Sequence, residues 1–139
     1  MWTKIVFFAA AALVFAAPLP AQAVELVMVE RDGCAYCARW NAEIAPIYPK
    51  TPEGAFAPLR RLDVKERPDD VEFASRPVLT PTFVLVDEGR ELMRIEGYGG
   101  DDLFWSMLSV ILRDYTEFDV DAQIETTPDT DRTDATPTQ

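Results

Sequence analysis

The two cysteines of the chain, Cys34 and Cys37, are the residues best suited to chemistry, because they lie three positions apart. A bridge between them would close a very short loop and stabilise the fold only weakly, which argues against a structural staple. Structural zinc needs four Cys or His ligands, and the sequence contains no histidine. Covalent haem attachment needs a histidine where Ala38 stands, and a Cys–His nucleophile also lacks its base. The pair therefore indicates dithiol–disulfide chemistry, with an inert bridge as the alternative.

A strand and a helix are predicted on either side of this pair. Residues 25–30 form a compact run of strand-forming residues, and residues 31–33 interrupt it. Apolar residues then recur at helical spacing, so that Cys34 stands at the N-terminus of the predicted helix. Free N–H groups and the helix dipole stabilise a thiolate at that position, whereas Cys37 lies deeper on the same side. We therefore expect Cys34 to attack and Cys37 to resolve the mixed disulfide.

The remaining pattern predicts a single α/β domain. The apolar run that follows Pro81 predicts a central strand covered on both faces. This order of elements packs as one sheet with helices on both faces. The other predicted elements are strands at residues 59–64 and 90–96, a turn at 51–54, a short helix at 69–75 capped by Asp69, and a helix over 101–115 capped by Asp101.

The two ends of the chain are predicted to lie outside the domain. Residues 1–23 combine a charged start, an apolar run and the triplet Ala21-Gln22-Ala23, which is typical of a secretory signal peptide. The apolar run is shorter than the roughly 20 residues that span a bilayer. Residues 117–139 are acidic and poor in large apolar side chains, which predicts a disordered tail. Residues 24–116 then form one exported domain, in a compartment where disulfides persist.

The strongly acidic composition limits the classes of partner. The formal net charge is −11, and removal of residues 1–23 would take away Lys4 and no acidic residue. Nucleic acids and anionic membrane surfaces are both recognised through Lys and Arg. We therefore expect neither as a partner.

Two motifs, in this order along the chain, resemble those of the thioredoxin family. They are Cys34-Ala35-Tyr36-Cys37 and Thr80-Pro81-Thr82, the second just before the predicted central strand. The resemblance covers residues 25–115 and implies a thioredoxin-like fold, a central mixed sheet of about four strands with helices on both faces. It also implies that Pro81 is a cis-proline, that Thr80 docks the substrate, and that Ala35 and Tyr36 take part in substrate binding. An ordinary proline at the start of a strand is the alternative for Pro81.

A narrower resemblance is to the small periplasmic SoxS-type thioredoxins of bacterial sulfur-oxidation systems. It rests on residues 34–40, 44–50 and 58–61. It implies a monomeric periplasmic thiol-disulfide oxidoreductase that reduces a cysteine-bearing protein, a sulfur carrier in particular. A membrane thiol-electron transporter would supply its electrons, because the sequence contains no nicotinamide or flavin motif. The redox-active Cys34–Cys37 disulfide would act without a further cofactor or metal.

Departures from the thioredoxin pattern keep other functions open. Gly33 replaces the Trp that precedes the first cysteine of thioredoxin, and Met28 replaces a buried Asp that serves proton transfer. Glu30 is a candidate substitute for that acid, although the sequence does not place it near Cys37. Tyr36 and Thr80 are also similar to residues of glutaredoxins and periplasmic isomerases. A periplasmic isomerase or oxidase, and a non-catalytic binding or regulatory module, are therefore the alternatives.

Overall fold

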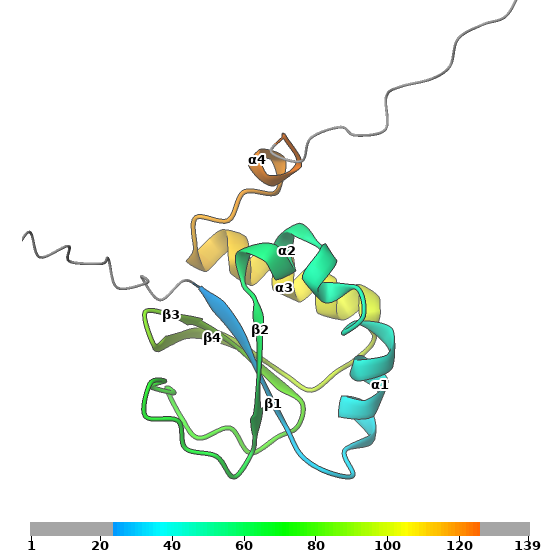
Figure 1. Cartoon of the computed structure of the whole chain (residues 1–139), viewed down its shortest axis with the longest axis vertical. Coiled ribbons are helices and arrows are strands. Elements are labelled where there is room, and N and C mark those ends of the chain that lie inside the picture. The colour runs from blue at the N-terminus through cyan, green and yellow to red at the C-terminus, as the bar shows by residue number, and fades with distance from the viewer. Residues whose placement is uncertain (1–23, 126–139) are drawn as a thin grey trace, which may run out of the picture.

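A four-stranded mixed sheet forms the centre of the molecule in the computed structural model, which describes residues 24–125 (Figure 1). The strands are β1 (Glu25–Glu30), β2 (Leu59–Asp63), β3 (Thr82–Asp87) and β4 (Arg90–Glu96), in the order β2-β1-β3-β4. β1 runs parallel to β2 and antiparallel to β3, and β3 and β4 form a hairpin. The predicted α/β class with a mixed sheet of four strands is confirmed.

Within residues 24–125, four α-helices and one short 3-10 helix accompany the sheet. They are α1 (Ala35–Glu43), η1 (Tyr48–Lys50), α2 (Pro52–Phe56), α3 (Asp101–Tyr115) and α4 (Val120–Glu125). The turn predicted at residues 51–54 is instead the start of α2, because the Thr51 hydroxyl accepts a hydrogen bond from the Gly54 N–H and Pro52 takes the first helical position. Gly100, and not Asp101, is the N-cap of α3.

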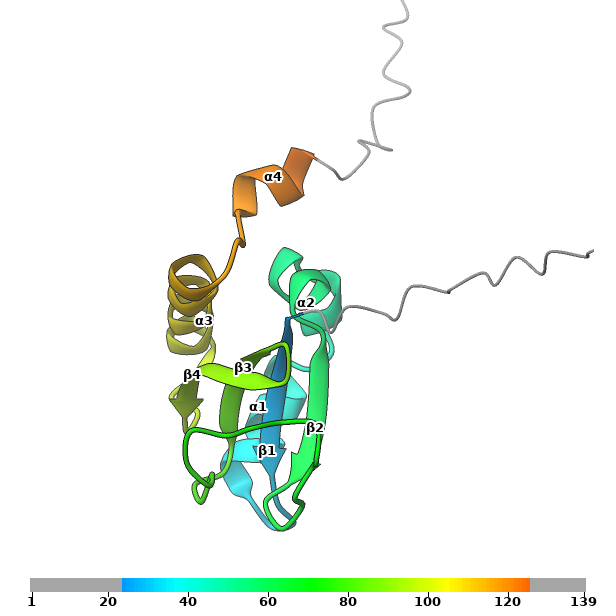
Figure 2. The same ribbon diagram turned by 90° about the vertical axis from the view of Figure 1, so that its left-hand side faces the viewer.

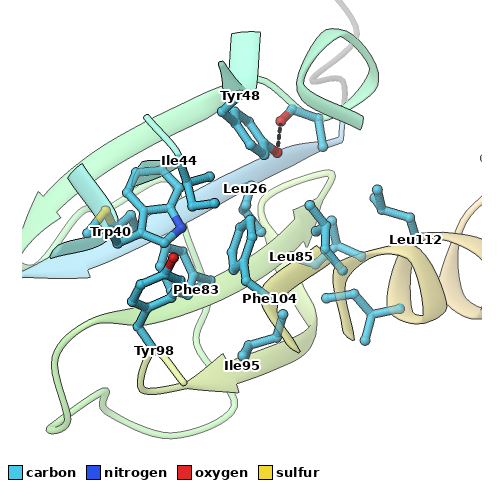
Figure 3. Close-up of a cluster of buried hydrophobic side chains, with 14 of the residues drawn as sticks. Leu26, Trp40, Ile44, Tyr48, Phe83, Leu85, Ile95, Tyr98, Phe104 and Leu112 are labelled. Atoms are coloured by element: carbon cyan, nitrogen blue, oxygen red, sulfur yellow. Dashed lines mark hydrogen bonds between the residues drawn. The ribbon is translucent and has the colours of Figure 1, made fainter. Parts of the chain in front are cut away.

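The main hydrophobic core lies between the sheet and the helices α1, α2 and α3 (Figure 3). The rings of Trp40, Phe83 and Phe104 meet at its centre, with centroids 4.9–5.6 Å apart. Tyr48 is fully buried, and its hydroxyl donates a 2.7 Å hydrogen bond to the Ala57 carbonyl. Burial raises the pKa of the Tyr48 phenol, which therefore stays neutral. This core fixes α1 on the sheet and with it the two cysteines at its start.

The opposite face of the sheet is covered by residues 64–79, which cross it as an irregular segment (Figure 2). The prediction of a helix at 69–75, and hence of helices on both faces, is therefore wrong. Val71 and Phe73 both pack against the valines of this face, and residues two apart share a side only in extended chain. Glu72, between them, forms an isolated bridge with Arg90.

Two charged residues of β4 fasten this covering segment. Glu91 and Arg94 form a largely buried ion pair, with 5% and 15% of their side chains exposed. The Glu91 carboxylate also accepts a 2.9 Å hydrogen bond from the Ala74 N–H, and Arg94 donates a 2.7 Å bond to the Ser75 carbonyl. The segment that leads to Thr80 is therefore not helical, and side-chain hydrogen bonds from β4 hold it on the sheet.

The ordered domain extends beyond its predicted end at residue 116. Phe118 is buried and packs edge-on against Phe56 at 5.1 Å, and α4 follows it. The predicted start of the tail at 117 is therefore too early, because one large apolar side chain there finds a place in the core. The predicted signal peptide at 1–23 and residues 126–139 of the predicted tail lie outside the described residues. Within residues 24–125, none of the helices is long and apolar enough to cross a membrane.

Candidate active site

Cys34 and Cys37 lie at the junction between β1 and α1, as the sequence predicts. Gly33 has a φ of 73°, a left-handed conformation that suits glycine and turns the chain into the helix. Cys34 is the N-cap of α1, and its sulfur accepts a 3.1 Å hydrogen bond from the Cys37 N–H. The two residues form a disulfide. Cys34 is 9% exposed and Cys37 is 2% exposed, so Cys34 is the more accessible of the two residues.

Thr80 and Pro81 lie directly beside this disulfide. The Cys34 sulfur is 3.3 Å from the Thr80 carbonyl oxygen, although the two residues are 46 positions apart. The Thr80–Pro81 peptide bond is cis. Its surroundings are fixed by a 2.8 Å hydrogen bond from the Thr82 hydroxyl to the Leu79 carbonyl and by a 2.7 Å bond from the Gly97 N–H to the Pro81 carbonyl. The structure therefore brings the two sequence motifs together as one site.

Exposed apolar side chains follow Cys34 and precede Thr80 in the sequence. Tyr36 is 60% exposed on the first turn of α1, next to the exposed Ala35. Val78 and Leu79, which directly precede Thr80, are 67% and 54% exposed. Sequence reasoning named Ala35 and Tyr36 but missed Val78 and Leu79. The sequence signal for these two residues was a pair of large apolar side chains that precedes Thr80 and belongs to no predicted element.

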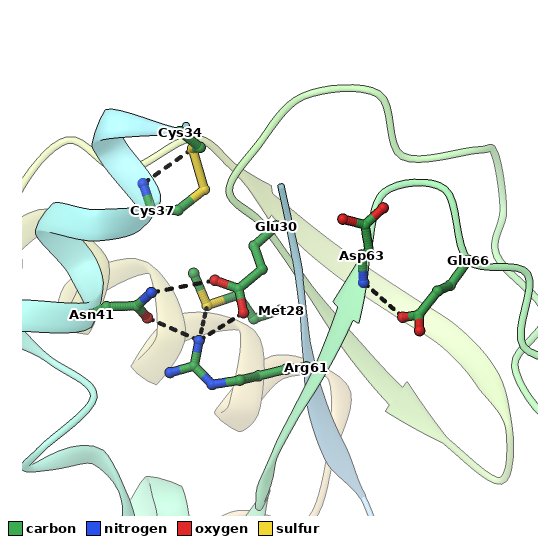
Figure 4. Close-up of polar contacts among 8 residues, drawn as sticks. All are labelled: Met28, Glu30, Cys34, Cys37, Asn41, Arg61, Asp63 and Glu66. Carbon is green, nitrogen blue, oxygen red and sulfur yellow. Dashed lines mark hydrogen bonds and ion pairs between the residues drawn. A yellow bond between two sulfur atoms is a disulfide. The ribbon is translucent and has the colours of Figure 1, made fainter. Parts of the chain in front are cut away.

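A polar cluster of Glu30, Asn41 and Arg61 lies near the disulfide, at the carboxyl end of β1 (Figure 4). The Glu30 carboxylate accepts a 2.9 Å bond from Arg61 and a 3.3 Å bond from the Asn41 amide. The same Arg61 nitrogen donates to the Asn41 amide oxygen at 2.9 Å and lies 3.6 Å from the Met28 sulfur. Sequence reasoning named Met28 and Glu30 but missed Asn41 and Arg61. The contacts of these two residues with Glu30 depend on the register of β1 against β2 and on the position of α1 on the sheet.

The cysteines and part of the polar cluster line one hollow of about 410 Å³. Its lining includes Cys34 and Cys37 together with Glu30 and Asn41. Within the described part of the chain, no three His, Cys, Asp or Glu side chains are grouped so that they could hold a metal ion.

A second polar contact anchors α1 to the loop after β4. The Tyr98 hydroxyl donates a 2.6 Å hydrogen bond to Glu43, which also pairs with Arg39 at 3.0 Å. The bond from Tyr98, followed by the one from Arg39, lowers the pKa of the Glu43 carboxyl. Burial, followed by the bond to Glu43, raises the pKa of Tyr98 to about 12. Since Gly97 in this loop bonds to Pro81, the contact helps to hold α1 and the Thr80–Pro81 motif in register.

Together, the fold and the paired sulfurs define a thiol-disulfide oxidoreductase of the thioredoxin type. The crystal structure of the periplasmic thioredoxin SoxS from Paracoccus pantotrophus, in its reduced form, matches with 48% sequence identity and a TM-score of 0.64. The match covers 65% of this chain and 96% of that one. The chain therefore belongs to the thioredoxin family and is similar to periplasmic SoxS.

More distant structures also align with the chain. Fasciola hepatica thioredoxin is 15% identical, covers 65% of this chain and 82% of its own, and gives a TM-score of 0.46. A thioredoxin-fold protein from Helicobacter pylori is 19% identical, covers 75% and 78%, and gives a TM-score of 0.49. No protein-family model matches the sequence, and no curated protein matches it either.

Proposed function

We propose that the protein is a periplasmic reductase of disulfides or blocked cysteines in a partner protein, and that this partner is a cysteine-bearing sulfur carrier of a sulfur-oxidation system. One observation carries the proposal. The outer sulfur, on Cys34, lies at a helix N-terminus 3.3 Å from the Thr80 carbonyl, where a partner cysteine can meet both. Helix N-terminal N–H groups favour the thiolate that attack requires.

The reaction moves two electrons from the enzyme to the partner. In the reduced enzyme the Cys34 thiolate attacks one sulfur of the partner disulfide, and the other partner sulfur leaves as a thiolate. Cys37 then attacks the Cys34 sulfur, the Cys34–partner bond breaks, and the second partner sulfur leaves. The Cys37 proton passes to a base or to solvent. The partner disulfide is reduced to two thiols, and the two enzyme thiols become the Cys34–Cys37 disulfide.

The surroundings of the disulfide support docking of an extended segment of the partner. The Thr80 backbone, beside Cys34, offers an edge to which such a segment can pair by main-chain hydrogen bonds. Tyr36, Val78 and Leu79 supply exposed apolar surface on its flanks. We therefore expect the partner cysteine to lie in an extended stretch with apolar neighbours.

The compartment and the electron source are parts of the same proposal. The similar SoxS is described as a periplasmic thioredoxin, and residues 1–23 have the pattern of a secretory signal. Each turnover leaves the Cys34–Cys37 disulfide oxidised, so a reductant must restore it. We assign this role to a membrane thiol-electron transporter, which would dock at the same outer sulfur.

Trapping of the partner tests the proposal. In Cys37→Ala the resolving step is absent, so Cys34 should hold partner proteins as mixed disulfides that mass spectrometry identifies after non-reducing purification from periplasm. Cys34→Ala, which keeps Cys37 alone, is the matched control and should trap little, because Cys37 is 2% exposed. The absence of any disulfide-linked protein from the Cys37→Ala sample would contradict the proposed function.

Equilibration with glutathione buffers tests the direction of electron flow. Related sites range from about −270 mV for a reductant to about −120 mV for an oxidant. A reductase requires a potential near the lower end of that range. A value near the upper end would instead indicate an oxidase, and a bridge that glutathione or dithiothreitol fails to open would indicate the non-catalytic module.

A further inference from the structure

The buried resolving cysteine raises the question of where its proton goes. Cys37 is 2% exposed and belongs to the main core, where apolar surroundings favour the neutral thiol over the thiolate. In the resolving step this thiol must lose its proton as its sulfur bonds to that of Cys34. Both cysteines line one hollow, and a base on its wall can reach Cys37 while α1 stays folded. This inference rests on the proposed function, because only a cycling dithiol needs such a base.

Glu30 is the acid that the structure holds in place at this hollow. Residues alternate between the faces of β1, so Glu30 lies on the same face as Leu26 and Met28, which is the face that carries α1. Its side chain is 25% exposed. Arg61 and Asn41 each bond to one of its two carboxylate oxygens, at 2.9 and 3.3 Å. The carboxylate is therefore fixed at the wall of the hollow between β1 and α1.

The two residues that hold Glu30 are themselves fixed. Arg61 is paired with Met28 in the parallel register of β1 and β2, and its guanidinium lies 5.8 Å from the centre of the Trp40 ring. One Arg61 nitrogen also donates to Asn41 at 2.9 Å, which closes a triangle of hydrogen bonds around the carboxylate. Asn41 lies on α1 four residues after Cys37, so it is one turn away on the same side of the helix.

The other charges near Glu30 are arranged differently. Arg31 and Asp32 line the same hollow from the turn before α1, and both residues are exposed. Asp63 and Glu66 line a neighbouring hollow. Glu66 accepts a 2.7 Å bond from the Asp63 N–H, and the Asp63 carboxylate accepts a 2.8 Å bond from the backbone N–H of Lys65. Glu30 is thus the carboxylate of this region that bonds to a residue of the cysteine-bearing helix.

We propose that Glu30 receives the proton of Cys37 during the resolving step, through solvent in the shared hollow, and that Arg61 and Asn41 are positioning residues for its carboxylate. The Cys37 electron pair forms the bond to the Cys34 sulfur, the bond from Cys34 to the partner breaks, and the partner leaves as a thiolate. The proton moves to the Glu30 carboxylate and then to solvent. When the disulfide is reduced again, Glu30 returns a proton to the departing Cys37 sulfur.

Stopped-flow reaction of the reduced protein with excess 5,5′-dithiobis(2-nitrobenzoate) separates the two steps. The first release of nitrothiobenzoate reports attack by Cys34, and the second reports resolution by Cys37. In Glu30→Gln we expect the second phase to slow by about tenfold or more near pH 7, the low end of general-base effects, and the first to change by less than about twofold. The second phase should then rise about tenfold per pH unit, because hydroxide replaces the carboxylate.

Two further variants distinguish a proton-accepting role of Glu30 from a purely structural one. Glu30→Asp retains the carboxylate and should recover part of the lost second-phase rate, which a purely structural role of the side chain does not predict. Asp32→Asn removes the other carboxylate of the hollow and should leave both phases within about twofold of the wild type. An unchanged second phase in Glu30→Gln at every pH, an equal loss in Asp32→Asn, or an equal loss of both phases in Glu30→Gln would overturn the proposal. This reagent is not the partner, so both phases remain measurable even if no partner protein is trapped.

Discussion

Truncation of the apolar residues beside Thr80 tests how the partner is recognised. Full burial of a Val or Leu side chain contributes about 1.5–3 kcal/mol relative to full exposure. Val78 and Leu79 are 67% and 54% exposed in the free protein, so docking can still bury roughly half of each. Because Ala keeps the β-carbon, each truncation should remove about 1 kcal/mol of docking energy, and the double variant Val78→Ala, Leu79→Ala about 2 kcal/mol. That corresponds to a loss of about 30-fold in kcat/KM.

The assay compares a protein substrate with a small one. Reduction of insulin, followed by precipitation of its B chain, should lose about 30-fold in kcat/KM in the double variant. Reduction of 5,5′-dithiobis(2-nitrobenzoate), which needs no docking surface, should change by less than about twofold. Val110→Ala is the matched control, because Val110 is 44% exposed on α3 and lies in no part of the site. Full activity of the double variant towards insulin, or an equal loss with both substrates, would refute the reasoning.

Four further predictions concern the support of the site. Gly54→Ala should destabilise the oxidised protein by about 3 kcal/mol in urea unfolding, because a β-carbon there would lie 1.8 Å from the Tyr48 carbonyl oxygen; an unchanged midpoint would contradict this. Phe104→Ala should cost about 3–5 kcal/mol in the same measurement, since the ring packs at the centre of the core. Because the pKa of Tyr98 is raised, its neutral phenol contributes stability that is fully present below pH 10 and disappears as the pH rises to about 12. Tyr98→Phe should therefore lose less stability than the wild type over that pH range. Because the pKa of Glu43 is lowered, its carboxylate contributes stability at neutral pH that disappears as the pH falls through the lowered pKa. Glu43→Gln should therefore lose less stability than the wild type as the pH falls.

The elements with a clear period could be predicted from the sequence. The apolar runs of β1 and β3 and the hairpin to β4 lie where the pattern puts them, and Cys34 takes the N-cap of α1. The helix predicted at 69–75 failed because a few polar residues after Pro68 fit a helix start and an irregular segment equally well. Only the packing of Val71 and Phe73 against the sheet distinguishes the two, and that packing depends on distant strands.

Some residues of the site could likewise be predicted from the sequence, and others could not. The cysteine pair and the Thr80–Pro81 motif are local signals, and the structure places them 3.3 Å apart. The cluster of Glu30, Asn41 and Arg61 comes from three elements, and Arg61 reaches Glu30 only because the register sets it opposite Met28. A shift of β2 by one residue would turn Arg61 to the opposite face. Sequence alone does not fix that register.

The irregular cover of the second sheet face links recognition to local stability. Residues 64–79 lead directly into Thr80, and Glu91 and Arg94 tie them to β4. Segments held by a few side chains open at lower free energy than helices packed in the core. An opening of this segment would uncover Val27 and Val84 and displace the docking edge at the same moment, while the disulfide stays seated on α1. Amide hydrogen exchange in the covering segment would therefore report on the opening that displaces the proposed docking edge.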